Sequence, residues 1–564
     1  MDVREKKRMR TCIPILILIL LLCTASGFAA APNIGDELGF LWETDGQRLM
    51  LVPVETREGT ALFLPGGCDG NLTVVIPKER EFSWEGKTLR NGDATDFSAW
   101  IGKTANVTLG PWSFPVKVMR GSAISALFFR ITEEDWNRVS NNRNLDIREQ
   151  ASLVMVNAKG KTEVSDTLTS FHLHGNSTAF GQKKPFQFKL EKKASLDGMG
   201  RGKTWMLLAN WFDISLLRNQ ITFDLCRELG LSGTPDCSQT DIYVNGAYRG
   251  TYLLTEKIQL KKNRLEITNM EDELETLNGK EISSARRLGS SRHATKVLKY
   301  FDVTEPEDIT GGFLLEIEKA LHFTNNEEDA GFVTDGKMCV VIKEPSQPGL
   351  QAANFIAGLV NDFHNAVLAQ NGVNPSTGKA YSDYIDMHSF AAKILVEEFS
   401  SNYDVRAGSQ FMYKDSDRVD PLLHAGPGWD YDLTYGNKED GNLNPLRMDY
   451  VFNRSSATSQ LYHYLLTHSD FRKYTRKLLE EEGIPAMEIL LGKKKAPEGC
   501  AVKSLREYCD AVRDSAEMNF TLWNPRLVSD ITDRSGRTFS EACDYLTDWI
   551  EQRSGMMRSE WLKD

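Results

Sequence analysis

The chain has 564 residues and a formal net charge of −11 at pH 7, and 41% of its residues are hydrophobic. This acidic balance argues against a nucleic-acid-binding protein, because phosphate contacts need a basic surface. The hydrophobic fraction suffices for a packed core, and the length suggests more than one domain.

Residues 1–31 have the pattern of a secretory signal peptide. Basic side chains precede an apolar run from Cys12 to Cys23, and the small residues that follow suit cleavage after Ala29. The run is shorter than the roughly 20 residues that a membrane-spanning helix needs, and no later stretch is apolar enough to span. We therefore expect a secreted or cell-surface protein. An uncleaved anchor and a lipid-modified Cys23 are the alternatives.

Seven cysteines remain after the signal peptide, and export would permit disulfides among them. None forms a Cys-x-x-Cys pair, so we expect no zinc site. The pairs closest in sequence, Cys226–Cys237 and Cys500–Cys509, are candidates for disulfides. Because the count is odd, at least one thiol stays unpaired, and spacing does not decide the pairing.

The pattern of residues 32–118 predicts a small β-sandwich-like N-terminal domain. Short apolar runs alternate with glycine- and asparagine-containing turns about every ten residues. This segment shows no catalytic chemistry. Its tryptophans, Trp84, Trp100 and Trp112, would suit a cell-wall glycan if they were exposed, or else belong to the core.

The stretch 169–219 suggests nucleotide binding. A polar turn containing Asn176 and Ser177 precedes an alternating run, 184–190, whose three apolar residues share one face of a strand. Lys189 lies on the other face. A small-residue loop whose backbone N–H groups cover phosphates, followed by a strand lysine, suits a nucleoside triphosphate. The alternative for Lys189 is a strand face that meets only water.

A helix and a hairpin are predicted next. Apolar residues at helical spacing indicate a helix over 215–229, which carries Arg218. Asn245-Gly246 between two alternating runs is a strong hairpin signal, and the second strand ends near Glu256. By themselves, Arg218 fits a solvated or structural charge and Glu256 an edge-strand carboxylate. A charged, turn-rich insertion, a strand and two amphipathic helices follow, at 263–308, 311–318, 353–368 and 388–399.

A group of carboxylates follows the second of these helices. Asp404 lies in a polar loop, with Ser409 five residues later. Asp430 and Asp432 are two residues apart, so they share one face of an extended segment. Two carboxylates on one face repel each other unless a cation or a proton lies between them, and Mg²⁺ prefers such oxygen ligands together with phosphates. We therefore predict a Mg²⁺ site at Asp430 and Asp432. Solvated loop carboxylates are the alternative for this pair.

Several blocks, in this order, resemble the spore coat protein H (CotH) kinase family, whose members are atypical, secreted or spore-associated protein kinases. The resemblance extends from about Ile124 to Arg553. The blocks are GNST at 175–178, KKPFQFKL at 183–190, KTWMLLANWFD and SLLRN within 203–219, the hairpin at 245–256, the N-x-D at 402–404, WDYDLTYG at 429–436 and a closing helix at 544–553.

The resemblance implies an α+β fold in which an atypical, two-lobed, protein-kinase-like domain with a helical C-terminal part occupies 119–564. Such a domain would transfer the γ-phosphoryl group of ATP to Ser or Thr of a secreted or surface protein, with Mg²⁺. Asp404 would orient or deprotonate the acceptor hydroxyl, Asp430 would hold Mg²⁺, and Asp432 would assist. The nucleotide would be contacted by Lys189, with Lys184 as the alternative, and by Asn176, Ser177, Glu256 and Arg218.

Departures from the family pattern leave alternatives open. The family loop is expected to begin Arg-Gly-Asn-Ser-Thr-Trp, but this chain has His174 in place of the arginine and Ala179 in place of the tryptophan. Ordinary kinases have Asn five residues after the catalytic aspartate, and this chain has Ser409 there. By this analogy Ser409 would be a further metal ligand, with less reach than Asn. A catalytically inactive surface or spore-coat binding protein is one alternative, and carbohydrate attachment through the N-terminal domain is another.

Overall fold

The computed structural model describes residues 33–77, 80–147, 151–175, 177–279, 287–288, 298–325, 329–406, 408–438, 442–447, 457–524 and 538–563. The predicted signal peptide and Asn176 lie outside these residues. Helices and strands are mixed along the chain, in agreement with the expected α+β class. None of the helices in the described residues is long and apolar enough to cross a membrane.

The N-terminal part forms two β-sheets that share one hydrophobic core. Trp84 is buried in this core and Trp100 packs against it, so Trp84 offers no surface to a glycan. The first sheet contains β2 (Gln47–Leu51), β1 (Gly39–Thr44), β5 (Asn71–Val75) and β8 (Ala94–Asp96), and the second contains β3 (Val54–Thr56), β4 (Gly59–Leu64), β10 (Trp112–Arg120), β9 (Thr104–Leu109), β6 (Glu81–Trp84) and β7 (Lys87–Arg90).

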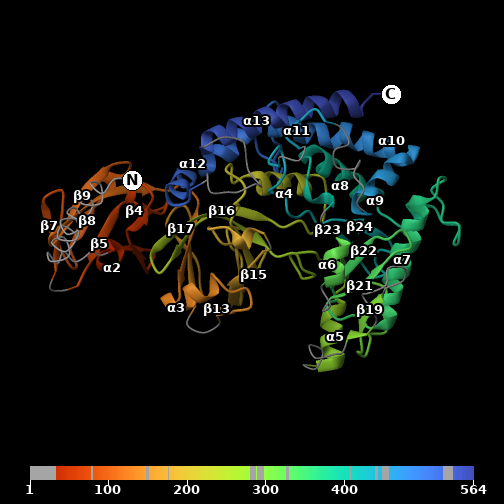
Figure 1. The fold of residues 1–564 in the computed structure, drawn as a ribbon, viewed down its shortest axis with the longest axis horizontal. Helices are drawn as coiled ribbons and strands as arrows, with labels where there is room; N and C mark the ends of the chain where they lie inside the picture. Colours follow the sequence, from red (N-terminus) through yellow and green to blue (C-terminus); the bar gives the residue numbers. More distant parts are fainter. Residues whose placement is uncertain are drawn as a thin grey trace, which may run out of the picture.

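A closed seven-stranded barrel follows, next to the two sheets (Figure 1). Phe186, Phe188 and Leu190 are buried in its interior, so the predicted alternation of this strand is confirmed. At the predicted hairpin, Asn245 and Gly246 have φ values of 52° and 87°, as a tight two-residue turn requires. The barrel strands are β11 (Ser125–Arg130), β12 (Ser152–Val156), β13 (Thr162–Leu173), β14 (Phe186–Ala194), β15 (Gly202–Leu208), β17 (Ala247–Glu256) and β16 (Cys237–Val244).

A seven-stranded sheet, the β18–β24 sheet, and most of the helices form the rest of the described molecule. They surround its largest hydrophobic core. The sheet runs in the order β18 (Arg287–Leu288), β19 (Leu298–Phe301), β21 (Ala330–Val333), β22 (Cys339–Glu344), β20 (Phe313–Glu318), β23 (Gln410–Lys414) and β24 (Leu423–Ala425). The main helices are α4 (Arg218–Glu228), α5 (Met270–Asn278), α7 (Leu350–Leu368), α8 (Met387–Ser400), α9 (Ala457–Thr467), α10 (Ser469–Leu478), α11 (Ile484–Leu490), α12 (Leu505–Leu522) and α13 (Phe539–Met556).

The last two helices run along one side of the molecule (Figure 1). The α12 helix packs on the barrel, where Ser515 Oγ donates to Asp241 Oδ2 at 2.7 Å. The α13 helix holds the end of α8, because the buried guanidinium of Arg553 pairs with the buried carboxylate of Glu398 at 2.7 Å. The C-terminal part of the chain thus braces both the barrel and the helix that leads to Asp404.

Hydrophobic packing joins the N-terminal sheets to the barrel. The rings of Phe63 and Tyr248 are 4.6 Å apart between centroids, and those of Trp42 and Phe128 are 6.4 Å apart. The core of the two sheets therefore continues onto the outer surface of the barrel. A domain boundary near residue 118 stays a prediction.

The cysteines of the described residues are all unpaired, including both predicted candidate pairs. Six of the seven are buried. Cys226, for example, lies next to the hydroxyl of Tyr431 at 3.5 Å. Sequence proximity therefore did not identify a disulfide.

We expect Phe63→Ala to destabilise both the N-terminal sheets and the barrel. The side chain is buried and contacts Tyr248, so its loss should lower the free energy of unfolding by about 3–5 kcal/mol. Hydrogen exchange read by mass spectrometry should rise in β16 and β17 as well as in β4.

The matched control is Phe82→Ala, which empties a site inside the two-sheet core beside Phe40. Its exchange increase should be confined to the N-terminal sheets. Equal patterns in the two variants would contradict the coupling of the sheets to the barrel.

Candidate active site

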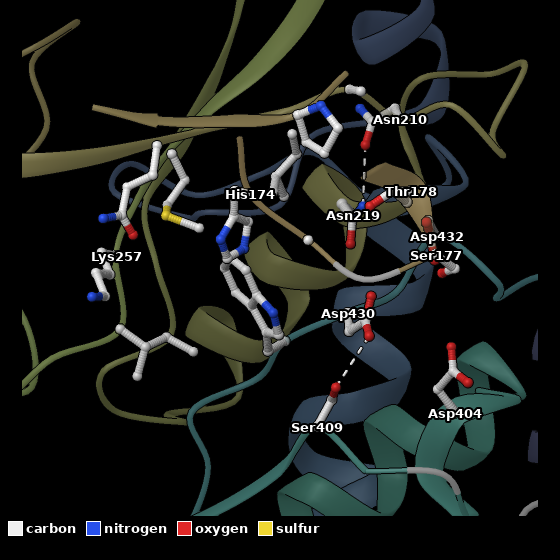
Figure 2. Close-up of a pocket in the computed structure, with 18 of the residues that line it drawn as sticks. His174, Ser177, Thr178, Asn210, Asn219, Lys257, Asp404, Ser409, Asp430 and Asp432 are labelled. Atoms are coloured by element: carbon white, nitrogen blue, oxygen red, sulfur yellow. Dashed lines mark hydrogen bonds between the residues drawn. The ribbon is translucent and has the colours of Figure 1, made fainter. Parts of the chain in front are cut away.

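A cavity of about 720 Å³ lies between the outer face of the barrel and the β18–β24 sheet. Its barrel wall comes from β13, β14, β15 and the end of β17. The other wall comes from β20, β22 and β23 and from the segments that follow α8 and β24. Many of the predicted site residues line this space (Figure 2).

Three carboxylates converge at one end of the cavity (Figure 2). One oxygen each of Asp404, Asp430 and Asp432 lies within 4.8 Å of the other two. Asp404 begins the short 3-10 helix η5 (Asp404–Arg406) after α8, and its N–H donates to Asn402 Oδ1 at 2.9 Å. Asp430 and Asp432 belong to the irregular segment after β24. The structure thus brings together the three aspartates that the sequence predicted.

The segment around Asp430 is not extended, which corrects the predicted geometry. Asp430 has φ = 68°, in the left-handed region that costs a non-glycine residue about 1–3 kcal/mol. Ser409, also left-handed with φ = 59°, donates from Oγ to Asp430 Oδ2 at 3.1 Å and from its N–H to Glu316 Oε1 at 3.1 Å. The carboxylates converge because the backbone turns between them while Tyr431 points into the core.

Burial and mutual repulsion shape the electrostatics of this cluster. Burial raises the pKa of Asp430, although the Ser409 hydroxyl opposes the shift. Burial, with the charges of Asp430 and Asp404, raises the pKa of Asp432 well above its ordinary value, and Arg218 opposes this. Crowded carboxylates of this kind favour a bound cation, and an all-oxygen donor set suits Mg²⁺. The residues present therefore fit the predicted metal.

Arg218 does not line the cavity but contacts the backbone close to Asp432. It is fully buried, pairs with Asp213, and donates from Nε to the backbone oxygen of Thr434 at 3.0 Å. The expectation that it reaches the nucleotide is corrected, because its donors are directed at Asp213 and at the loop that follows Asp432.

Two asparagines that sequence reasoning did not single out line the cavity. Asn219 Oδ1 accepts from the backbone N–H of Tyr431 at 2.8 Å, and Asn219 Nδ2 donates to Asn210 Oδ1 at 3.1 Å (Figure 2). They fix the Asp430–Asp432 segment from the side of α4. The available signal was their place in the block ANWFD…SLLRN, which matched the family.

The cation on the barrel wall is Lys257, not Lys189. Lys189 is exposed and does not line the cavity. The residue of β14 that lines it is Gln187, two positions before Lys189. Lys184 is turned away as well, because its Nζ donates to the backbone oxygen of Ala179 at 2.9 Å. Burial lowers the pKa of Lys257, although Glu344 opposes the shift.

Glu256 is a buried structural carboxylate. It is not the edge-strand carboxylate that was the alternative, because β17 pairs with both β15 and β16 in the closed barrel. It is buried outside the cavity, where it pairs with Arg264 and accepts from the N–H of Asp236 at 3.2 Å. Burial raises its pKa to about 7, against the charge of Arg264. Neighbouring strand residues point to opposite faces, so the prediction of a cavity residue here was wrong by one position.

The predicted phosphate loop borders the cavity through Gly175, Ser177 and Thr178. His174 stands before it. Burial, together with the positive charge of Lys257, lowers the pKa of His174 to about 4. The imidazole is therefore neutral near pH 7, and it does not replace the charge of the arginine expected in the family.

The chain matches a known protein family over more than half of its length. A family model described as CotH kinase protein matches residues 171–335 and 353–557. The matched segments contain the phosphate loop, Lys257 and all three aspartates of the cluster. No curated protein sequence matches the chain.

We expect Asp432→Asn to stabilise the metal-free protein. The change removes one charge from a crowded, buried cluster, so in EDTA its Tm should exceed that of the wild type by a few degrees. In excess Mg²⁺ the wild type should gain stability and the variant should gain less, because a ligand is lost.

The control is Asp514→Asn, an exposed carboxylate on α12. It should change Tm little in either condition. A lower Tm for Asp432→Asn in EDTA would contradict the repulsion that we derive for the cluster.

Proposed function

Because the chain belongs to the CotH kinase family, we propose that it is an atypical protein kinase that uses ATP and Mg²⁺. It would phosphorylate Ser or Thr of secreted or surface proteins. The observation that carries the proposal is the convergence of Asp404, Asp430 and Asp432 in a cavity that also contains Lys257. The signal-peptide pattern of residues 1–31 supports export.

The metal site would be formed by Asp430 and Asp432 with the hydroxyl of Ser409. When bound there, Mg²⁺ supplies positive charge to the terminal phosphates of the nucleotide. Ser409 has less reach than the asparagine of ordinary kinases, but its hydroxyl already contacts Asp430 at 3.1 Å. The protein groups are thus arranged before any ligand arrives.

The nucleotide would occupy the rest of the cavity, whose volume of about 720 Å³ is in the range of small-molecule sites. Trp429 lines it and is held by stacking on Phe223, with ring centroids 5.6 Å apart. Such a fixed aromatic surface suits a base. Lys257 and the backbone of the 175–178 loop would meet the phosphates. On the opposite wall, Lys343 of β22 pairs with Glu316 at 3.3 Å.

Asp404 would act on the acceptor hydroxyl. It is half-buried at the carboxylate end of the cavity, in a loop whose backbone is held by Asn402. As the hydroxyl oxygen bonds to the γ-phosphorus, the bond from that phosphorus to the β,γ-bridging oxygen would break and ADP would leave with the electron pair. The hydroxyl proton would pass to the Asp404 carboxylate. Positioning and proton transfer of this kind are worth roughly 10²- to 10⁴-fold in rate.

The second candidate function is a nucleotide-binding protein without transferase activity. Neutral His174 in place of an arginine is the observation that favours it, because the cavity loses one fixed positive charge next to the phosphate loop. ATP binding without phosphoryl transfer would distinguish this candidate from the kinase.

We expect the purified protein to transfer label from γ-labelled ATP, with Mg²⁺, to a generic acceptor protein. Asp404→Asn should lower the rate by about 10²-fold or more, because the acceptor hydroxyl loses its base. Asp430→Asn should also abolish transfer. Unchanged labelling by Asp404→Asn would contradict the role of this residue, and an ATP-induced rise in Tm without labelling by the wild type would favour the inactive protein.

We expect Lys257→Met to weaken ATP binding by about 10- to 100-fold, the value of one hydrogen bond to a charged group. Titration calorimetry with a non-hydrolysable ATP analogue measures this. Lys189→Met is the matched control on the same barrel face and should bind as the wild type does. Weaker ATP binding by Lys189→Met, with unchanged binding by Lys257→Met, would identify Lys189 as the phosphate ligand instead.

A further inference from the structure

We infer that Tyr431 is a positioning residue, whose hydroxyl is anchored on α8 and sets where Asp430 and Asp432 stand relative to Asp404. The inference rests on the proposed function, because it concerns the same metal site. Tyr431 lies between the two aspartates in sequence, but its side chain points away from the cavity into the core.

A buried ion pair holds the Tyr431 hydroxyl. Lys393 and Glu397 lie one turn apart on α8, both fully buried, with 2.5 Å between Nζ and Oε1. The Tyr431 hydroxyl donates to Glu397 Oε1 at 3.1 Å and accepts from Lys393 Nζ at 3.1 Å. The hydroxyl is therefore fixed in two directions by groups that are themselves paired.

Stability alone does not account for this arrangement. Taking two charges out of water costs several kcal/mol per ion, and apolar residues of similar size often serve a core equally well. The Lys393–Glu397 pair does orient the Tyr431 hydroxyl, because a hydrogen bond weakens steeply when its partner moves by about 1 Å or rotates. A fixed direction is what a tyrosine between two metal-binding residues needs.

The backbone of Tyr431 is also held, on both sides. Its N–H donates to Asn219 Oδ1 at 2.8 Å, and its carbonyl oxygen accepts from Thr434 Oγ1 at 2.6 Å. With the side chain tied to α8, the residue is fixed at three points. The left-handed turn at Asp430 and the carboxylate of Asp432 are then set on either side of a fixed residue.

The α8 helix is also the element that delivers Asp404. It ends at Ser400, whose backbone oxygen accepts from the N–H of Tyr435 at 2.8 Å, and Asp404 follows within four residues. The Lys393–Glu397–Tyr431 network is thus a direct link between the two segments that supply the three carboxylates. Without it, Asp430 and Asp432 can move relative to Asp404 although every ligand is present.

The test is Mn²⁺ binding to the full-length, nucleotide-free protein, followed by electron paramagnetic resonance. Mn²⁺ serves as the probe because it takes the same oxygen ligands as Mg²⁺. Tyr431→Phe keeps the ring against Phe223 and removes only the anchored oxygen. We expect its Kd for Mn²⁺ to rise about 10- to 100-fold, as when groups that orient metal ligands are changed.

The matched control is Tyr248→Phe. This change also removes a buried hydroxyl that donates to a buried carboxylate, Asp241, at 3.1 Å, but in the barrel. It should lower Tm without changing the Kd for Mn²⁺. If Tyr431→Phe does not fold, Glu397→Gln, which keeps the shape and removes the charge, replaces it and is expected to raise the Kd.

An unchanged Kd in the folded Tyr431→Phe variant, or in the Glu397→Gln variant that replaces it, would overturn the inference, and so would a wild-type protein that binds no Mn²⁺. Failure of the proposed kinase activity looks different. A wild type that binds Mn²⁺ but transfers no phosphate would leave the positioning role of Tyr431 in place.

Discussion

The repulsion among Asp404, Asp430 and Asp432 is the constraint on which the rest of this structure depends. Three carboxylates with oxygens within 4.8 Å of one another do not stay together in a partly buried site unless their backbones are held. Arg218 holds the loop after Asp432 through Thr434, and Asn219 holds the N–H of Tyr431. The metal-free folded protein therefore already contains the unfavourable repulsion among the three carboxylates, and a bound divalent cation would reduce that repulsion.

Contacts far from the cavity also hold in place the helix before Asp404 and the barrel wall of the cavity. Arg553 near the C-terminus pairs with Glu398 close to the end of α8, so the helix before Asp404 is fixed by a segment more than 150 residues away. The α12 helix braces the barrel, whose outer face provides the other wall of the cavity.

Local patterns predicted the parts of the site that depend on neighbours in sequence. The hairpin at Asn245-Gly246 follows from backbone conformation alone, and the three aspartates follow from short motifs in a fixed order. Lys189 and Lys257 could not be told apart in this way, because both project from the outside of a barrel. The packing of the β18–β24 sheet decides which part of the barrel surface faces the cavity. Tertiary contacts likewise decide that Arg218 is buried.

Diffraction from crystals grown with Mn²⁺ and a non-hydrolysable ATP analogue would show where the metal and the nucleotide bind, because the anomalous signal of Mn²⁺ marks the position of the metal. We expect a metal bound by oxygens of Asp430 and Asp432, with the phosphates between it and Lys257 and the γ-phosphate facing Asp404. A nucleotide bound outside this cavity, or one bound in it with no metal at the aspartates, would rule out this arrangement.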